Sequence, residues 1–192
     1  MSAMIYLMRH GSIVGHDVMR FVGQSEVELD DAGLAMAERR RESLSAVEFS
    51  RVLSSELSRT RRTAEIVSGV QPEIVAELNE ISLGQWQGRT VESIRQTEPD
   101  VYAARGRDIA GFRPPGGESF RDLADRAWPA FENIMQNAST NVLVVAHGGV
   151  NRVLLCMLLG MPLSNLFRLG QDYGCLNLIA LKNGAPVVRA MN

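Results

Sequence analysis

Short segments that are apolar throughout alternate along this chain with longer segments of mixed character. Residues 4–8 and 142–146 show the first pattern most clearly, which is typical of strands buried on both faces of a parallel sheet. The alternation predicts an α/β fold, a three-layer α/β/α arrangement with a mostly parallel central sheet. We predict strands at residues 4–8, 51–54, 73–75, 142–146 and 176–181, and an edge strand at 187–189.

Helices are predicted where apolar side chains return every three or four residues. Residues 119–135 carry such a stripe, which predicts a helix face directed at the core. Pro129 lies inside this segment and predicts a kink or a restart near Trp128, because proline lacks a backbone N–H. No repeat or linker divides the sequence, so residues 1–192 are expected to form a single domain. The predicted helices are residues 31–44, 57–67, 91–96, 119–135 and 149–159.

The net charge of −2 and the pI near 6.0 provide no broad positive field of the kind that attracts nucleic acids or anionic membranes. The longest apolar stretch, residues 150–159, is interrupted by polar side chains and is too short to cross a bilayer. Arg9 comes too early for a signal peptide, so we expect a cytoplasmic protein. Cys156 and Cys175 are expected to be buried, reduced thiols.

Two of the three histidines follow a predicted strand and precede a glycine. Arg9 and His10 come after the strand at 4–8, and His147 comes after the strand at 142–146. Ligands of open parallel sheets gather outside the carboxyl ends of the strands, so these side chains are expected to share one site. A single histidine in such a place is more often a hydrogen-bonded structural residue, but the matched pair favours a functional role.

An arginine-rich segment follows the predicted strand at 51–54. Ser54 or Ser55 is a candidate N-cap for the helix that comes next. Arg59 lies one turn into this helix, from where its guanidinium can reach the same sheet edge and hold phosphate oxygens in a bidentate fork. Arg61 and Arg62 are instead expected on a solvated helix face.

Glu80 lies in a loop punctuated by glycines and next to Trp86. A carboxyl group beside a bound dianion favours its protonated form, because like charges repel and burial disfavours ionisation. Such a group suits the role of a general acid. An exposed loop glutamate is an equally good interpretation of the residues taken alone.

Six segments occur in the order typical of one family: LMRHG at 7–11, GQSEVELDDAG at 23–33, SSELSRTRRTAEI at 54–66, LNEISLGQWQG at 78–88, GGES at 116–119 and AHGG at 146–149. Together they resemble the histidine phosphatase superfamily, which includes cofactor-dependent phosphoglycerate mutases and many small phosphatases. The resemblance covers nearly the whole chain and implies a phosphoglycerate mutase-like fold.

The resemblance also implies a role for each matching residue. His10 is expected to be the nucleophile that forms a phosphohistidine, and Arg9 and Arg59 are expected to clamp the phosphoryl group. His147 is expected to contact the phosphoryl oxygens, and Glu80 to give a proton to the leaving group. Further substrate contacts are expected from Ser12, His16, Gly23, Gln24 and Gly148.

Some of these assignments have local alternatives. Glu77 and Glu118 remain alternatives to Glu80 as the proton donor. Many members of the family carry a small hydroxyl residue three positions after the nucleophile and an asparagine six positions after it, where this chain has Ile13 and His16. One phosphate contact of the family is therefore missing or replaced by Ser12 or His16, although an exposed loop histidine is the simpler interpretation of His16.

Residues 89–115 fall where the family places a cap over the pocket. Arg95, Arg105, Arg107 and Arg113 lie in this segment and are candidates for binding a second anionic group, or they simply solvate the cap. The chain looks short for a phosphoglycerate mutase. Its length and its spacing resemble those of alpha-ribazole phosphatases, while PPGGESFRDL resembles the fructose-2,6-bisphosphatase type.

The predicted function is a metal-independent phosphomonoester hydrolase for a small metabolite, such as alpha-ribazole 5'-phosphate or a sugar phosphate. Two arginines and a histidine can supply the positive charge that phosphoryl transfer needs, so no cofactor is expected. A phosphoglycerate mutase and a phosphate-binding module without turnover remain alternatives. A nucleotide-binding domain is disfavoured because neither G-x-G-x-x-G nor a Walker A loop occurs. The oligomeric state stays open, with a homodimer as one option.

Overall fold

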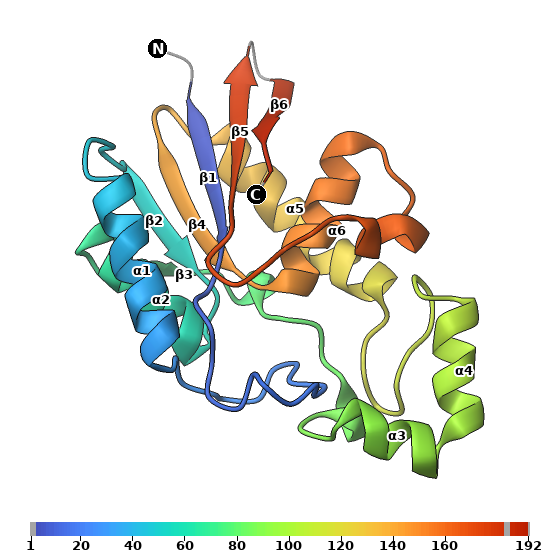
Figure 1. The fold of residues 1–192 in the computed structure, drawn as a ribbon. Coiled ribbons are helices and arrows are strands. Elements are labelled where there is room, and N and C mark those ends of the chain that lie inside the picture. Colours follow the sequence, from blue (N-terminus) through green and yellow to red (C-terminus); the bar gives the residue numbers. More distant parts are fainter. Residues whose placement is uncertain (1–2, 183–184, 192) are drawn as a thin grey trace.

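The computed structural model describes residues 3–182 and 185–191, so the first two residues, residues 183–184 and residue 192 of the predicted domain lie outside it (Figure 1). Within this part of the chain, six strands form one sheet in the order β3-β2-β4-β1-β5-β6. The first four in this order are parallel, whereas β5 and β6 are antiparallel to their neighbours. The strands are β1 (Met4–Arg9), β2 (Arg51–Ser54), β3 (Glu73–Ile74), β4 (Val142–Ala146), β5 (Leu176–Lys182) and β6 (Ala185–Ala190).

Helices cover both faces of the sheet and confirm the predicted α/β class (Figure 1). The pair α1 (Asp31–Ser43) and α2 (Ser58–Ser68) covers one face, and the pair α5 (Phe120–Gln136) and α6 (Gly148–Leu159) covers the other. None of the helices in the described residues is both long and apolar enough to cross a membrane. The remaining elements are α3 (Val91–Thr97), α4 (Pro99–Arg107) and the 3₁₀ helices Ala76–Leu78, Gly84–Trp86 and Leu163–Arg168.

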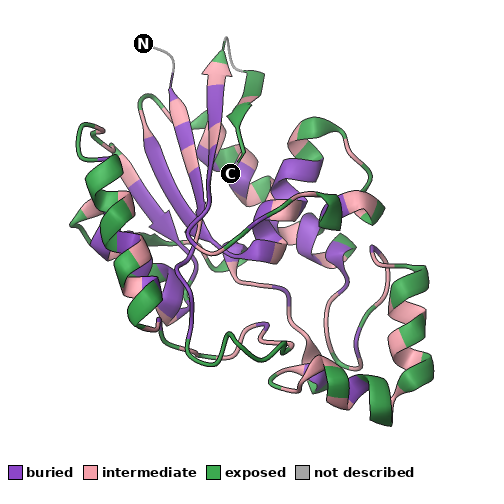
Figure 2. Cartoon of the chain, in the orientation of Figure 1, coloured by how far each residue is buried: buried purple, intermediate pink, exposed green. Residues whose placement is uncertain are grey.

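Residues 4–8 of β1 and all of β4 are apolar because consecutive side chains point into two different cores. In β1, Leu7 packs toward α5 and α6, while Met8 packs toward α1 and α2. In β4, Val144 and Val145 divide in the same way, and the whole strand is buried (Figure 2). Full burial of one such side chain contributes about 1.5–3 kcal/mol to the stability of the fold. The packing of these two strands therefore fixes the position of their carboxyl ends.

Helix α5 begins at a capping box, in which the Ser119 hydroxyl accepts from the Asp122 backbone N–H and the Asp122 carboxylate accepts from the Ser119 N–H. The expected restart near Trp128 is wrong, because α5 continues through Pro129 to Gln136. The stripe beyond the proline keeps the helix in place, since Phe131 is fully buried. One missing N–H is tolerated where core packing continues on both sides.

Residues 89–115 extend away from the sheet and contain α3 and α4 (Figure 1). Helix α4 was missed by the periodicity rule, because it buries no residue in a core and so carries no apolar stripe. Trp86 anchors the segment: it is fully buried, its indole N–H donates to Glu98, and its ring lies 5.0 Å from that of Phe21. Phe21 belongs to the loop after β1, so this loop and the segment are packed together.

Candidate active site

The carboxyl ends of β1 and β4 place His10 and His147 next to each other. Their ring centroids are 5.2 Å apart, with an angle of 65° between the ring planes. Both side chains are buried. The backbone N–H of His10 donates to the backbone carbonyl of Ala146 at 3.1 Å. The structure therefore brings together the two histidines that the sequence pattern paired, because parallel neighbouring strands end at the same sheet edge.

The His10 ring is held in one tautomer. Its Nδ1 lies 2.7 Å from the Gly11 carbonyl oxygen, which can only accept, so Nδ1 carries the proton. The other nitrogen, Nε2, is then the nucleophilic one. Burial, and next the charges of Arg59 and Arg9, hold the pKa of His10 well below its usual value. His10 is therefore neutral at physiological pH, as attack on phosphorus requires.

Arg59 projects from the first turn of α2 and is 1% exposed. Its two terminal nitrogens donate to the backbone carbonyls of Ser25 and Gly23, both at 2.7 Å. These bonds hold the guanidinium against the loop after β1, whereas Arg61 and Arg62 are exposed. Burial lowers the pKa of Arg59, but the group keeps its charge at neutral pH.

Arg9 is held from the opposite side by the segment that precedes β5. Its Nη1 donates to the Gln171 carbonyl, and its Cζ lies 3.8 Å from the centre of the Tyr173 ring. Tyr173 also lies 5.5 Å from the His10 ring, between centroids. A guanidinium stacked on an aromatic face is fixed in orientation, so Tyr173 helps to aim Arg9.

Three nitrogen atoms around these histidines are buried and have no hydrogen-bond partner within residues 3–182 and 185–191. They are Arg9 Nε, Arg59 Nε and His147 Nδ1. A buried polar atom without a partner costs about 1–3 kcal/mol, which is a reason to expect a ligand there. Two of the three nitrogens belong to positively charged guanidinium groups, so the expected ligand is an anion.

Glu80 lies at the N-terminus of α6. Its carboxylate accepts the Ile81 N–H at 2.9 Å and the Gly149 N–H at 3.0 Å. A β-carbon at position 149 would lie 2.4 Å from Glu80 Oε1, so a larger residue there would displace this carboxylate. The second glycine after His147 therefore allows Glu80 to bind the start of α6, in the pocket that His10 also lines.

A pocket of about 250 Å³ lies at this sheet edge. Arg9, His10, Arg59 and Glu80 form its polar floor, and its walls are largely apolar. His147 is in contact with His10 but is not itself one of the lining residues. Arg105 of α4 also lines it, 5.7 Å from the Phe21 ring and 5.6 Å from the Phe167 ring. The lining side chains beyond the floor include Ile13, Val22, Leu83, Ile109, Phe112 and Phe120.

The sequence profile of the histidine phosphatase superfamily (branch 1) matches residues 5–192. The chain belongs to the histidine phosphatase superfamily. It is 29% identical to the adenosylcobalamin/alpha-ribazole phosphatase of Salmonella typhimurium, over 98% of this chain and 95% of that protein. It is 33% identical to the glucosyl-3-phosphoglycerate phosphatase of Mycolicibacterium vanbaalenii, over 84% of this chain and 76% of that protein.

A solved histidine phosphatase has the same fold. The crystal structure of the alpha-ribazole phosphatase from Shigella flexneri superposes with a TM-score of 0.89 at 29% identity. The match covers 98% of this chain and 96% of that one. The predicted phosphoglycerate mutase-like architecture is thereby confirmed.

Two residues that the family resemblance suggested as substrate contacts lie in a different network. The Ser12 hydroxyl donates to Asp30 Oδ1, and His16 Nδ1 lies 2.9 Å from Asp30 Oδ2. Asp30 is the N-cap of α1, and the His16 side chain is 46% exposed. Neither residue lines the pocket. Both contact the N-cap residue of α1 instead.

Of the three remaining predicted contacts, two line the pocket and the third supports it from outside. Gly23 and Gly148 line the pocket. The Gln24 side chain donates to the Glu80 carbonyl at 2.8 Å, so it supports the acid rather than facing the pocket. A β-carbon on Gly148 would lie 3.1 Å from Arg152 Nη1 and 3.3 Å from Arg9 Nε, so a larger residue there would press on both arginines.

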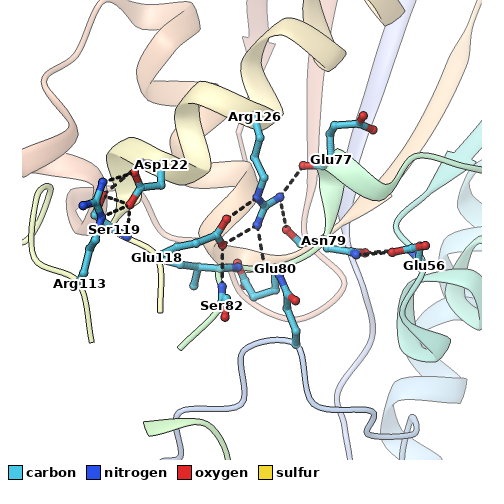
Figure 3. A network of polar contacts seen from close by, with 12 residues as sticks. Glu56, Glu77, Asn79, Glu80, Ser82, Arg113, Glu118, Ser119, Asp122 and Arg126 are labelled. Carbon is cyan, nitrogen blue, oxygen red and sulfur yellow. Dashed lines mark hydrogen bonds and ion pairs between the residues drawn. The ribbon is translucent and has the colours of Figure 1, made fainter. Parts of the chain in front are cut away.

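The two alternatives to Glu80 are placed less favourably. Glu77 is exposed and lies outside the pocket. Glu118 reaches the pocket wall but forms two hydrogen bonds with Arg126, at 2.8 and 2.9 Å, as Figure 3 shows. Burial alone would raise the pKa of Glu118, but the bonds from Arg126 and from the Ser82 N–H lower it. Glu118 is therefore held as an anion.

Sequence reasoning missed three supporting residues of this site. Arg126 donates to the Glu80 carbonyl at 3.0 Å and so positions the loop that carries the acid (Figure 3). Tyr173 packs on Arg9. Ser55, the candidate N-cap, instead contacts His147 Nε2 at 2.7 Å, while α2 begins after Leu57 with no side-chain cap. The sheet-edge rule applied to β2 would have found Ser55, since it follows that strand directly.

Across the residues that the structure describes, no three or more His, Cys, Asp or Glu side chains are grouped so that they could hold a metal ion.

Proposed function

We propose that this protein is a phosphomonoester hydrolase that works through a phosphohistidine on His10. The observation that carries the proposal is the neutral His10 ring, with Nε2 free, lying beside a second buried histidine and two arginines. The positive charge that the transferred phosphoryl group requires comes from Arg9 and Arg59. Membership of the histidine phosphatase superfamily supports the same reaction.

The reaction takes place in two balanced steps. In the first step, His10 Nε2 attacks phosphorus, the bond between phosphorus and the ester oxygen breaks, and Glu80 gives its proton to the departing oxygen. In the second step, water attacks the phosphohistidine and Glu80 takes up a proton from this water. The products are an alcohol and inorganic phosphate, and His10 returns to its neutral state.

The pocket walls support a small phosphorylated metabolite as the substrate. We propose residues 89–115 as a cap whose Arg105 and Phe112 contact the part of the substrate that lies beyond the phosphate. The relatives are named as an adenosylcobalamin/alpha-ribazole phosphatase and a glucosyl-3-phosphoglycerate phosphatase. We therefore propose a phosphate ester of a small metabolite as the substrate of this chain.

We also propose that the protein works in the cytoplasm. Cys156 and Cys175 are free and buried, which fits a reducing compartment. The net charge of −2 supports small molecules, rather than nucleic acids or anionic membranes, as partners.

A panel of phosphorylated metabolites, screened for released phosphate in the presence of a chelator, tests the proposal. Phosphate release that persists with the chelator is the expected result. No turnover on the whole panel, with inorganic phosphate still bound, would instead support a binding module. Conversion of phosphoglycerates that depends on a bisphosphate primer would identify a mutase.

Replacement of Glu80 by glutamine is expected to affect poor leaving groups most. Loss of a general acid costs about 10²–10⁴-fold, and an alkyl phosphate needs the acid more than an aryl phosphate does. We therefore expect a fall in kcat of about 10²-fold or more on glycerol phosphate, and a much smaller fall on 4-nitrophenyl phosphate.

The matched control is Glu77→Gln, because Glu77 is exposed and lies outside the pocket. This variant is expected to behave as the unmodified protein does on both substrates. Equal losses on both substrates in Glu80→Gln would assign the proton to another donor.

A further inference from the structure

The second histidine is attached to a chain of hydroxyl groups. The Ser55 hydroxyl lies 2.7 Å from His147 Nε2 and 2.7 Å from the Thr60 hydroxyl. The Thr60 hydroxyl in turn lies 2.8 Å from the Leu57 carbonyl oxygen. His147, Ser55 and Thr60 are all fully buried, so water does not compete for these contacts.

A count of hydrogen atoms decides the tautomer of His147. Three short contacts run from Leu57 O through Thr60 and Ser55 to the ring, and each needs one hydrogen. The Leu57 carbonyl can only accept, so Thr60 donates to it and Ser55 donates to Thr60. Only the ring can then supply the third hydrogen, from Nε2. The Leu57 N–H, 3.3 Å from Ser55 Oγ, fills the other lone pair of this oxygen.

The other ring nitrogen, Nδ1, then carries a bare lone pair. It is buried without a hydrogen-bond partner in the described part of the chain. The charged and titratable groups that surround the ring are Arg59 on α2, Arg9 and His10 at the end of β1, and Arg126 on α5. Burial and these groups lower the pKa of His147 well below its usual value, so the free ring is neutral.

We propose that Ser55 and Thr60 are positioning residues that hold His147 as the Nε2–H tautomer, so that a bound dianion requires uptake of one proton at Nδ1. The proposal rests on the proposed function, in which His147 contacts the phosphoryl oxygens. A lone pair facing an anionic oxygen is repulsive, whereas an Nδ1–H is a charge-assisted donor. The proton comes from solvent when the anion binds and returns to solvent when inorganic phosphate leaves.

The sign of the pH dependence follows directly. Because the complex holds one proton more than the free protein and the dianion, affinity falls as pH rises. One linked proton corresponds to about a tenfold loss of affinity per pH unit. If His147 were already the Nδ1–H tautomer in the free protein, the affinity for the dianion would not have this slope with pH.

Sulfate is the suitable probe, because it stays a dianion throughout the range. Its dissociation constant is measured by calorimetry between about pH 6 and pH 9, where arginine remains charged. The expected slope is about one decade per pH unit. The titration is repeated in His10→Gln and in Glu80→Gln, since His10 and Glu80 are the other groups at this site that can take up a proton, and the slope is expected to persist in both.

Two variants separate this role from a purely structural one. Ser55→Ala removes the acceptor of the Nε2–H, and Thr60→Val frees the Ser55 hydroxyl to donate to the ring. Both changes favour the Nδ1–H tautomer and are expected to flatten the slope. Ser68→Ala is the control, because this hydroxyl lies at the far end of the same helix and bonds only to nearby backbone.

Equal losses of affinity at every pH, with an unchanged slope in Ser55→Ala and Thr60→Val, would overturn the positioning role. Nitrogen-15 spectra of the imidazole rings read the tautomer directly, and Nδ1–H in the free protein would overturn the proposal as a whole. Sulfate binding without proton uptake would do the same and leave the phosphatase assignment intact. A protein that binds no sulfate or phosphate and releases none from the panel would instead contradict the proposed function.

Discussion

Replacement of His10 by alanine is expected to abolish turnover, with kcat reduced by about 10⁴-fold or more, because the variant has no atom to accept the phosphoryl group. The reason lies in geometry as much as in chemistry. The ring is buried and its Nδ1 is bound to Gly11 O, which leaves Nε2 as the attacking atom. The measurement is acid-labile labelling by a phosphorylated substrate, which is expected to disappear.

The third histidine supplies a matched control for His10→Ala. His16 is half exposed and contacts Asp30 rather than the pocket, so His16→Ala is expected to keep the acid-labile label. Circular dichroism shows whether each variant is folded. A label that persists in folded His10→Ala would transfer the nucleophile to another residue, and loss of label in His16→Ala would place that ring in the site.

Replacement of Arg59 by alanine is expected to weaken binding of inorganic phosphate by about 10²-fold, because each hydrogen bond to a charged group contributes about 1.5–3 kcal/mol. The variant also leaves the Gly23 and Ser25 carbonyls without the partners that hold the loop. We therefore expect a lower thermal midpoint as well as weaker binding. Calorimetric titration with phosphate and thermal unfolding measure the two effects separately.

Arg61→Ala is the control on the same helix, since Arg61 is exposed two residues away. It is expected to leave phosphate affinity unchanged and to alter stability by less than about 0.5 kcal/mol. Arg59→Lys keeps the charge but loses the planar fork, and is expected to bind phosphate with intermediate affinity. A larger loss of phosphate affinity in Arg61→Ala than in Arg59→Ala would show that Arg61, and not Arg59, clamps the phosphoryl group.

Most of the sheet could be predicted from the sequence, because the signal for each strand lies in its own residues. Strands β1 and β4 are buried on both faces, so their residues must be apolar throughout, and this leaves a direct signal in the chain. Helix α5 can be predicted from its apolar stripe and from its capping box, which are both visible in the sequence. Helix α4 leaves no such signal, because it packs none of its residues into a core.

The site was predicted in part. His10, Arg9, Arg59 and Glu80 do line one pocket together, and the His147 ring lies against that of His10. The expectation that Ser12 or His16 would replace a missing phosphate contact finds no support in the geometry. Both side chains contact Asp30 instead, because the two carboxylate oxygens of this helix N-cap lie close to them.

The amino-acid sequence by itself determined the α/β class, the pairing of His10 with His147 and the choice of Arg59 over its neighbours, because periodicity and strand ends are properties of nearby residues. Only the tertiary structure decided that Tyr173 stacks on Arg9 and that Ser55 holds His147. Tyr173 reaches the site because β5 pairs antiparallel with β1, so that its start meets the end of β1. Such pairing joins segments more than 160 residues apart, and no local pattern encodes it.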